Sequence, residues 1–157
     1  MLISGRVVRG RNERVIAMIP ILTVVILMTS SVQANFAASL PPCPAKPNCV
    51  SSQAAGGHHI EPFKIVGEAG GAFKKLRDLL VRRSDTKLVS SDDTTIRVEF
   101  RTFLGFVDDG LFLLDSAAST IHIRSAARLG FWDLGKNRNR VEEIRQTFER
   151  DQLPLSP

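Results

Sequence analysis

The sequence predicts an α+β fold: a single two-layer domain in which a mostly antiparallel sheet is covered on one face by two helices. Three observations carry this prediction. Apolar and polar residues alternate in segments between residues 94 and 125, which is the period of half-buried strands. Two other segments, 72–83 and 140–150, repeat apolar residues at helical spacing. The chain that follows an N-terminal leader, 35–157, has the length of one domain with a modest core.

Residues 1–34 have the organisation of a secretory signal peptide. Four arginines and one glutamate in residues 1–14 precede the apolar run 15–28, and small residues follow it. We expect cleavage after Ala34. The alternative is a membrane anchor formed by 15–28, although that run is shorter than the ~20 residues that span a bilayer and is interrupted by Pro20.

The leader also changes the meaning of the chain's charge. The formal net charge is +5, but the leader's arginines supply much of it, and the rest of the chain is close to neutral. The charge therefore gives no support to nucleic-acid binding. We expect the domain in the periplasm or outside the cell, in contact with a membrane only if the leader stays attached.

The segment 35–70 is rich in Pro and Gly and contains both cysteines, Cys43 and Cys49. Two cysteines six positions apart in an exported protein most simply form one disulfide. The alternative is a metal site that adds His58 and His59. Oxidised cysteines cannot be ligands and adjacent histidines are difficult to aim at one ion, so we expect a disulfide, no metal and no cofactor.

Each predicted helix has an apolar face and a recognisable start. Gly70 and Gly71 open the first, and Asn139 with Glu142 has the form of a capping pair at the start of the second. The residues expected to face the core are Phe73, Leu76, Leu79 and Leu80 in the first helix and Val141, Ile144 and Phe148 in the second. We expect the α+β core to occupy 71–150 and the tail, 151–157, to be disordered.

Strands are expected at 60–66, 87–91, 94–101, 110–115 and 119–125. The alternation in 94–101 gives the sheet one apolar and one polar face: Ile96, Val98 and Phe100 alternate with Arg97, Glu99 and Arg101. The dipeptide Asp-Gly is favoured in tight turns, so Asp108-Asp109-Gly110 is interpreted as a hairpin turn. The functional alternative is a single aspartate at the rim of the sheet that meets an arginine.

The run 124–140, RSAARLGFWDLGKNRNR, is the main candidate for function. It holds four arginines and one lysine against a single carboxylate. On the polar face of the sheet, Arg124 would lie with Arg97, Arg101 and His122, and Glu99 would neutralise one of these cations. The arginines could receive an anionic group, or they could be structural ties to aspartates on a solvated surface. Trp132 could be a core residue or a contact residue.

Four stretches, in this order, carry a family resemblance: CPAKPNCVSSQA, HHIEPF, GFVDD and RSAARLGFWDLGKNRNRVEEIR. Together they resemble the domain-of-unknown-function family numbered 1499, from about Pro42 to Phe148. That family comprises small exported or membrane-attached bacterial proteins with chloroplast relatives. It departs from this chain at Ala127, where a second serine is usual, and at Phe131-Trp132, where a smaller or tyrosine-containing step is usual. The missing serine weakens any serine-based mechanism.

The resemblance brings no assigned activity, but the family's motifs fall on a set of polar residues that we expect to form one network and a binding site. These are Asp108, Asp109, Arg124, Arg128, Asp133, Asn137, Arg138 and Arg140.

Three classes of function follow from these observations. The first, which we favour, is a non-catalytic binding or accessory module that receives an anionic small molecule, a lipid headgroup or an acidic segment of an envelope protein. The second is a small hydrolase or isomerase that pairs Asp108 or Asp109 with His122 or His59 in a pocket. The third is a structural partner in an envelope complex, which would present an exposed apolar patch.

Overall fold

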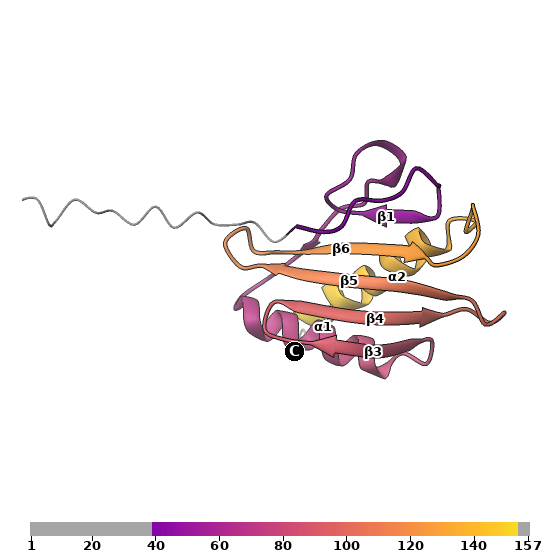
Figure 1. Ribbon diagram of the computed structural model, residues 1–157. Coiled ribbons are helices and arrows are strands. Elements are labelled where there is room, and N and C mark those ends of the chain that lie inside the picture. Colours follow the sequence, from indigo (N-terminus) through magenta and orange to yellow (C-terminus); the bar gives the residue numbers. More distant parts are fainter. Residues whose placement is uncertain (1–38, 154–157) are drawn as a thin grey trace, which may run out of the picture. The chain divides into compact units, whose positions relative to one another are not determined.

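A computed structural model describes residues 39–153, which belong to one compact unit. A six-stranded antiparallel sheet has the strand order β1-β6-β5-β4-β3, with β2 paired to β6 beside β1. Helices α1 and α2 both cover one face of it (Figure 1). The predicted α+β class is confirmed. The expected leader 1–34, its cleavage after Ala34, the alternative anchor 15–28, and residues 154–157 of the expected tail all lie outside the described residues.

The strands and helices follow one another with short connections. The strands are β1 (Cys49–Ser51), β2 (Phe63–Lys64), β3 (Thr86–Ser91), β4 (Thr95–Arg101), β5 (Val107–Asp115) and β6 (Thr120–Ala127). The helices are α1 (Ala69–Arg82) and α2 (Lys136–Gln152), with a single 3-10 turn at Gly56–His58. The strand β1 was not expected from the sequence, because three residues are too few to show a period.

Helix α1 begins at Ala69, three residues earlier than expected. The carboxylate of Glu68 accepts hydrogen bonds from the backbone N–H groups of Gly70 and Gly71, so the first turn is capped before the apolar repeat starts. The apolar face is as predicted: Phe73, Leu76, Leu79 and Leu80 are buried.

Helix α2 begins at Lys136 rather than Arg140. The expected capping pair of Asn139 and Glu142 is wrong, because Asn139 is already helical and donates its backbone N–H to Gly135 O at 3.0 Å. At the other end the helix continues to Gln152. The side-chain Nε2 of Gln152 donates to Lys64 O at 3.1 Å, and this bond holds residues that were expected in the tail.

The core lies between the helices and the inner face of the sheet. Val141, Ile144 and Phe148 of α2 are fully buried there, as predicted. The rings of Phe63 and Phe112 meet edge-on at 6.0 Å between centroids, and Phe148 packs on Phe63 at 5.8 Å. A core of this kind supplies most of the stability of a small domain.

The interpretation of Asp108-Asp109-Gly110 as a turn is wrong. All three residues lie within β5, and the hairpin turn comes earlier, where Thr102 N donates to Phe106 O at 2.9 Å. The glycine is needed for close packing: a Cβ on Gly110 would lie 2.6 Å from Val98 Cγ2 and nearer still to the ring of Phe100. A Gly that reads as a turn signal in sequence can equally mark a close approach inside a sheet.

The outer face of the sheet is less open than expected. Leu40 packs on Leu111 and Leu113, so all three side chains are buried although they lie on the polar face. Residues near the start of the described chain therefore cover part of that face. The disulfide between Cys43 and Cys49, which was predicted, closes the loop that follows.

We predict that Gly110→Ala destabilises the domain by about 1–3 kcal/mol, because the added methyl group must displace fully buried side chains. Gly57→Ala is the matched control, since nothing lies within 4 Å of a Cβ at that position and its backbone φ is not in the left-handed region. Urea denaturation of both variants checks this. Equal midpoints for the two variants would contradict the packing argument.

Candidate binding site

A buried ion pair joins the middle of the sheet to helix α2. Arg140 Nη1 donates to Asp108 Oδ2 at 2.8 Å, and the two residues are only 8% and 4% exposed. The guanidinium of Arg140 also lies over the ring of Phe100, 4.7 Å from its centroid. A charge in this position is tolerated only because it is paired and hydrogen-bonded.

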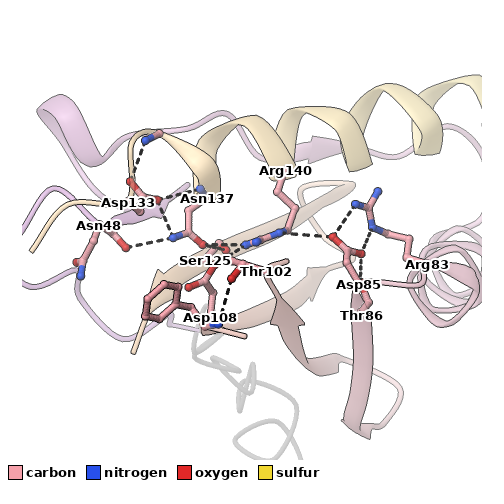
Figure 2. A network of polar contacts seen from close by, with 12 residues as sticks. Asn48, Arg83, Asp85, Thr86, Thr102, Asp108, Ser125, Asp133, Asn137 and Arg140 are labelled. Carbon is pink, nitrogen blue, oxygen red and sulfur yellow. Dashed lines mark hydrogen bonds and ion pairs between the residues drawn. The ribbon is translucent and has the colours of Figure 1, made fainter. Parts of the chain in front are cut away.

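Asn137 is the hub of the surrounding network (Figure 2). Its Oδ1 accepts from Ser125 Oγ at 2.5 Å and from Arg140 Nη1 at 3.3 Å. Its Nδ2 donates to Asp133 Oδ2 at 2.7 Å and to the backbone O of Asn48 at 3.3 Å. One side chain, 1% exposed, thus connects α2 to β6 and to the residue before β1.

Asp133 explains where α2 begins. Its two carboxylate oxygens accept from the backbone N–H groups of Gly135 at 3.0 Å and Asn137 at 2.9 Å. These are donors that a helix start leaves without intrahelical partners. The N-cap position of α2 is Gly135, and the side chain of Asp133, two residues earlier, supplies the capping acceptors that the sequence had assigned to Asn139.

The network extends to the end of α1 through Asp85. Asp85 Oδ1 and Oδ2 accept from Arg83 at 2.9 and 3.0 Å, and Asp85 Oδ2 lies 3.7 Å from Arg140 Nε. Partial burial would raise the pKa of Asp85, but the hydrogen bonds from Arg83 and Thr86 and the nearby arginine charges outweigh it, so the pKa lies below its usual value.

A second ion-pair group lies on the outer face and is not part of this network. Arg128 donates to Asp109 Oδ1 at 2.7 Å and to Glu99 Oε1 at 2.8 Å. The hydrogen bond from Arg128 holds the pKa of Glu99 below its usual value, and the two carboxylates raise the pKa of Arg128. Asp108 and Asp109 therefore point to opposite faces of β5 and have different partners.

Arg124 lies on the outer face, as expected. One guanidinium nitrogen reaches Pro42 O at 3.5 Å, while its buried Nε has no hydrogen-bond partner among the described residues. Burial lowers the pKa of Arg124. Arg138 donates to the backbone O of Gly57 at 2.9 Å. Of the eight residues expected to form one network, four do so: Asp108, Asp133, Asn137 and Arg140.

The histidines have partners other than Asp108 and Asp109. His122 Nδ1 lies 3.1 Å from Ser52 Oγ, and its Nε2 lies 3.9 Å from Asp115. His59 contacts the backbone O of Ala54 and Glu61 Oε1. Neither histidine forms a hydrogen bond or ion pair with Asp108 or Asp109, so the Asp–His pair that the enzymatic alternative requires is not formed by these residues. Within residues 39–153 there is also no group of three His, Cys, Asp or Glu side chains placed to hold a metal ion.

The end of the domain above the buried network is apolar, which the sequence reading missed. Seven large apolar side chains, each more than half exposed, lie in the β4–β5 turn and the β6–α2 connection. We name this set the apolar end: Phe103, Leu104, Phe106, Leu129, Phe131, Trp132 and Leu134. Figure 1 shows both loops at the same end of the sheet. The signal was present, because the tripeptide Leu-Gly-Phe occurs in both loops.

Two cavities adjoin one another at the apolar end. The first, named the apolar groove, has a volume of about 220 Å³ and runs between the two loops. Its apolar walls are Leu104, Phe106, Ala127, Leu129, Trp132 and Leu134. The second, named the polar cavity, is an open depression of about 370 Å³ lined by Arg101, Arg140, Asp85 and Glu143 among others. Thr102 and Lys136 line both cavities, so the apolar groove and the polar cavity share part of their walls.

The backbone of the loops is held in conformations that restrict them. Gly105 and Gly130 have φ of 82° and 88°, which favour glycine. Leu134 adopts a left-handed conformation with φ of 57°, which costs a residue with a side chain about 1 kcal/mol. A strained backbone at an exposed apolar residue is an arrangement that recurs at functional sites.

We predict that Asp108→Asn destabilises the domain by about 3–5 kcal/mol, because Arg140 would keep a buried charge without a counter-charge. Asp109→Asn makes the same chemical change one residue away at a half-exposed carboxylate, and about 0–1 kcal/mol is expected. Urea denaturation at neutral pH measures both. Equal losses in the free energy of unfolding would mean that the buried ion pair stabilises the domain no more than the exposed one.

Asp85 should make stability depend on pH. Its folded pKa lies below the ordinary value of 3.8, so its ion pairs stabilise the fold fully above that value and progressively less as the pH falls through the folded pKa. We predict that the free-energy difference between the natural protein and Asp85→Asn is constant near neutral pH and shrinks below about pH 4. A difference that is unchanged in acid would contradict this.

A search of curated proteins and a search of solved structures gave no match to the chain. No helix within residues 39–153 combines the length and apolar character needed to cross a membrane. The model of a family described as "Protein of unknown function (DUF1499)" matches residues 39–148, which include every residue of the buried network. The chain belongs to the DUF1499 family.

Proposed function

We propose that this domain is a non-catalytic binding module of the exported compartment and that its ligand is an anionic amphiphile, a molecule with an apolar chain and an anionic headgroup. The observation that carries the proposal is the apolar groove between two loops, with Lys136 at the boundary to the polar cavity. The Cys43–Cys49 disulfide supports an oxidising compartment.

The groove supports an apolar chain as one part of the ligand. Its walls come from two loops that are far apart in sequence and are fixed by the buried network beneath them. Ligand sites are generally lined by apolar and aromatic side chains with a few polar groups that fix orientation. The volume of about 220 Å³ suits a short segment of a chain rather than a whole bulky molecule.

The charges favour an anionic headgroup. The carboxylate of Asp108 is paired with Arg140, and that of Asp133 caps α2, so both aspartates at the groove are already engaged. Lys136 forms no ion pair among the described residues, and it stands at the first position of α2, where the helix dipole favours negative charge. An anion beside Lys136 would therefore find a cation that has no other ion-pair partner among the described residues.

A second candidate site for the anion is Arg124, because its buried Nε lacks a hydrogen-bond partner among the described residues. Buried polar groups without partners are uncommon and call for an explanation, such as a bound anion or water. The two sites lie on opposite sides of the sheet layer, so substitutions can separate them.

The test is a titration of the full chain with dihexanoylphosphatidylglycerol at concentrations where it is monomeric. Dihexanoylphosphatidylcholine, whose zwitterionic headgroup has no net charge, is the control of equal chain length. Trp132 is the only tryptophan and lines the groove, so its emission reports occupancy directly. We expect a shift to shorter wavelength, a higher melting temperature, and about fivefold weaker binding in Lys136→Gln.

Substitutions then locate the ligand. Leu129→Gln alters a wall of the groove and should abolish the response, while Phe131→Ser, two residues away and outside the groove, should leave it intact. Loss of binding in Arg124→Ala with full binding in Leu129→Gln would place the anion on the outer face and overturn the groove. If neither lipid changes the emission or the melting temperature, the proposal that the ligand is an amphiphile is overturned.

A further inference from the structure

We propose that the apolar end docks onto the surface of an anionic lipid bilayer and inserts the tips of its two loops. The inference rests on the proposed function for the chemical class of the ligand, but it concerns different side chains. A ligand in the groove would cover the groove walls. It would leave Phe131 in water, and Phe103 would not contact the apolar chain because it lines only the polar cavity.

The loop tips are more exposed than the groove requires. Phe103 is 103% exposed, more than in an extended reference peptide, and Phe131 is 68% exposed. Large apolar side chains gathered at one place on a surface mark contact sites, whereas single ones are common and need no explanation. The other large apolar residues that are exposed in the described chain are fewer, and only two of them, Leu88 and Val89, are neighbours in sequence.

The two ends of the sheet differ in polarity. At the opposite end, the β3–β4 turn contains Asp92 and Asp93, and the β5–β6 turn runs from Ser116 to Ser119. The antiparallel connections place these polar turns away from the apolar end, as Figure 1 shows. The domain is therefore amphipathic along the strands, which is the polarity that a protein lying on a bilayer needs.

The cations near the apolar end favour an anionic surface. Arg101 precedes the first loop, and Lys136 follows the second, so each apolar tip is attached to the domain beside a basic residue. Arg101 is 4.0 Å from Glu99, whose carboxylate is already bound at 2.8 Å by Arg128. Basic residues near an anionic membrane contribute about 1 kcal/mol each, and tryptophan favours the interface between headgroups and chains.

The first loop is closed at its base by hydrogen bonds of its own. Thr102 N donates to Phe106 O and Gly105 N donates to Thr102 O, both at 2.9 Å. The Oγ1 of Thr102 accepts from Phe106 N at 3.1 Å. Unpaired backbone groups are costly in the apolar part of a bilayer, so the three bonds that close this turn lower the cost of placing it at the headgroup interface.

The experiment uses the full chain and vesicles of phosphatidylcholine with or without phosphatidylglycerol. Emission from Trp132 reports insertion of this end specifically, whatever the leader does, since the chain has no other tryptophan. Lipids brominated on their acyl chains quench a tryptophan that reaches them. We expect a shift to shorter wavelength and quenching on vesicles that contain phosphatidylglycerol, and much less on phosphatidylcholine alone.

The variants test the residues. Phe103→Ser and Phe131→Ser should each weaken the vesicle response about tenfold, because each removes a large apolar side chain from the inserted surface. Val89→Ser, the same kind of change at an exposed valine of β3, should have no effect. Unchanged melting temperatures would show that the variants fold, as expected for exposed positions.

Each outcome decides between the two proposals. A response to vesicles but not to monomeric lipid supports bilayer docking and overturns the proposal that the apolar groove binds a single lipid molecule. A response to monomeric lipid, with no quenching on vesicles, overturns bilayer docking and supports the apolar groove as the lipid-binding site. An equal response to vesicles of zwitterionic phosphatidylcholine alone overturns the preference for an anionic surface. An emission already at short wavelength without lipid, together with a dimer in solution, would mean that a second copy covers the apolar end.

Discussion

The buried ion pair between Asp108 and Arg140 is the constraint on which the rest of this end of the domain depends. Two opposite charges removed from water are tolerated only in good geometry, and here the pair is supported by Asn137 and by the ring of Phe100. Because Asp108 belongs to the sheet and Arg140 to α2, the pair fixes how the helix lies on the strands. The first turn of α2 and the capping side chain of Asp133 are fixed with it.

A fixed first turn of α2 also fixes the loop that leads into it. Gly130, Leu134 and Gly135 all have positive φ, so the connection between β6 and α2 follows one restricted course from the sheet to the helix. Its apolar side chains are exposed, although Asp108, Asn137 and Arg140 below them are buried. Exposed apolar residues gain nothing from this position in the isolated domain. The contact surface proposed above would explain this exposure, since loops that already hold one conformation lose little entropy on binding.

The arginine-rich run 124–140 turns out to serve several purposes. Arg140 completes the buried network, Arg128 neutralises Asp109 and Glu99 on the outer face, and Arg138 holds the turn near Gly57. Of these four arginines, only Arg124 has a buried guanidinium nitrogen without a hydrogen-bond partner among the described residues. The structural interpretation of this run therefore accounts for three of its four arginines, and the sites proposed for a ligand depend mainly on its apolar residues and on Lys136.

The sequence by itself determined the fold class, the apolar faces of both helices, the four long strands and the disulfide, because each rests on local periodicity or on residue type. It also placed Asp108, Asp133, Asn137 and Arg140 in one feature, through a family motif rather than through physics. Only the tertiary structure decided that Asp108 and Asp109 part to opposite faces, that Asp133 caps α2, and that two distant Leu-Gly-Phe segments meet. These outcomes depend on strand register and on the partners available across the sheet, which local sequence does not contain.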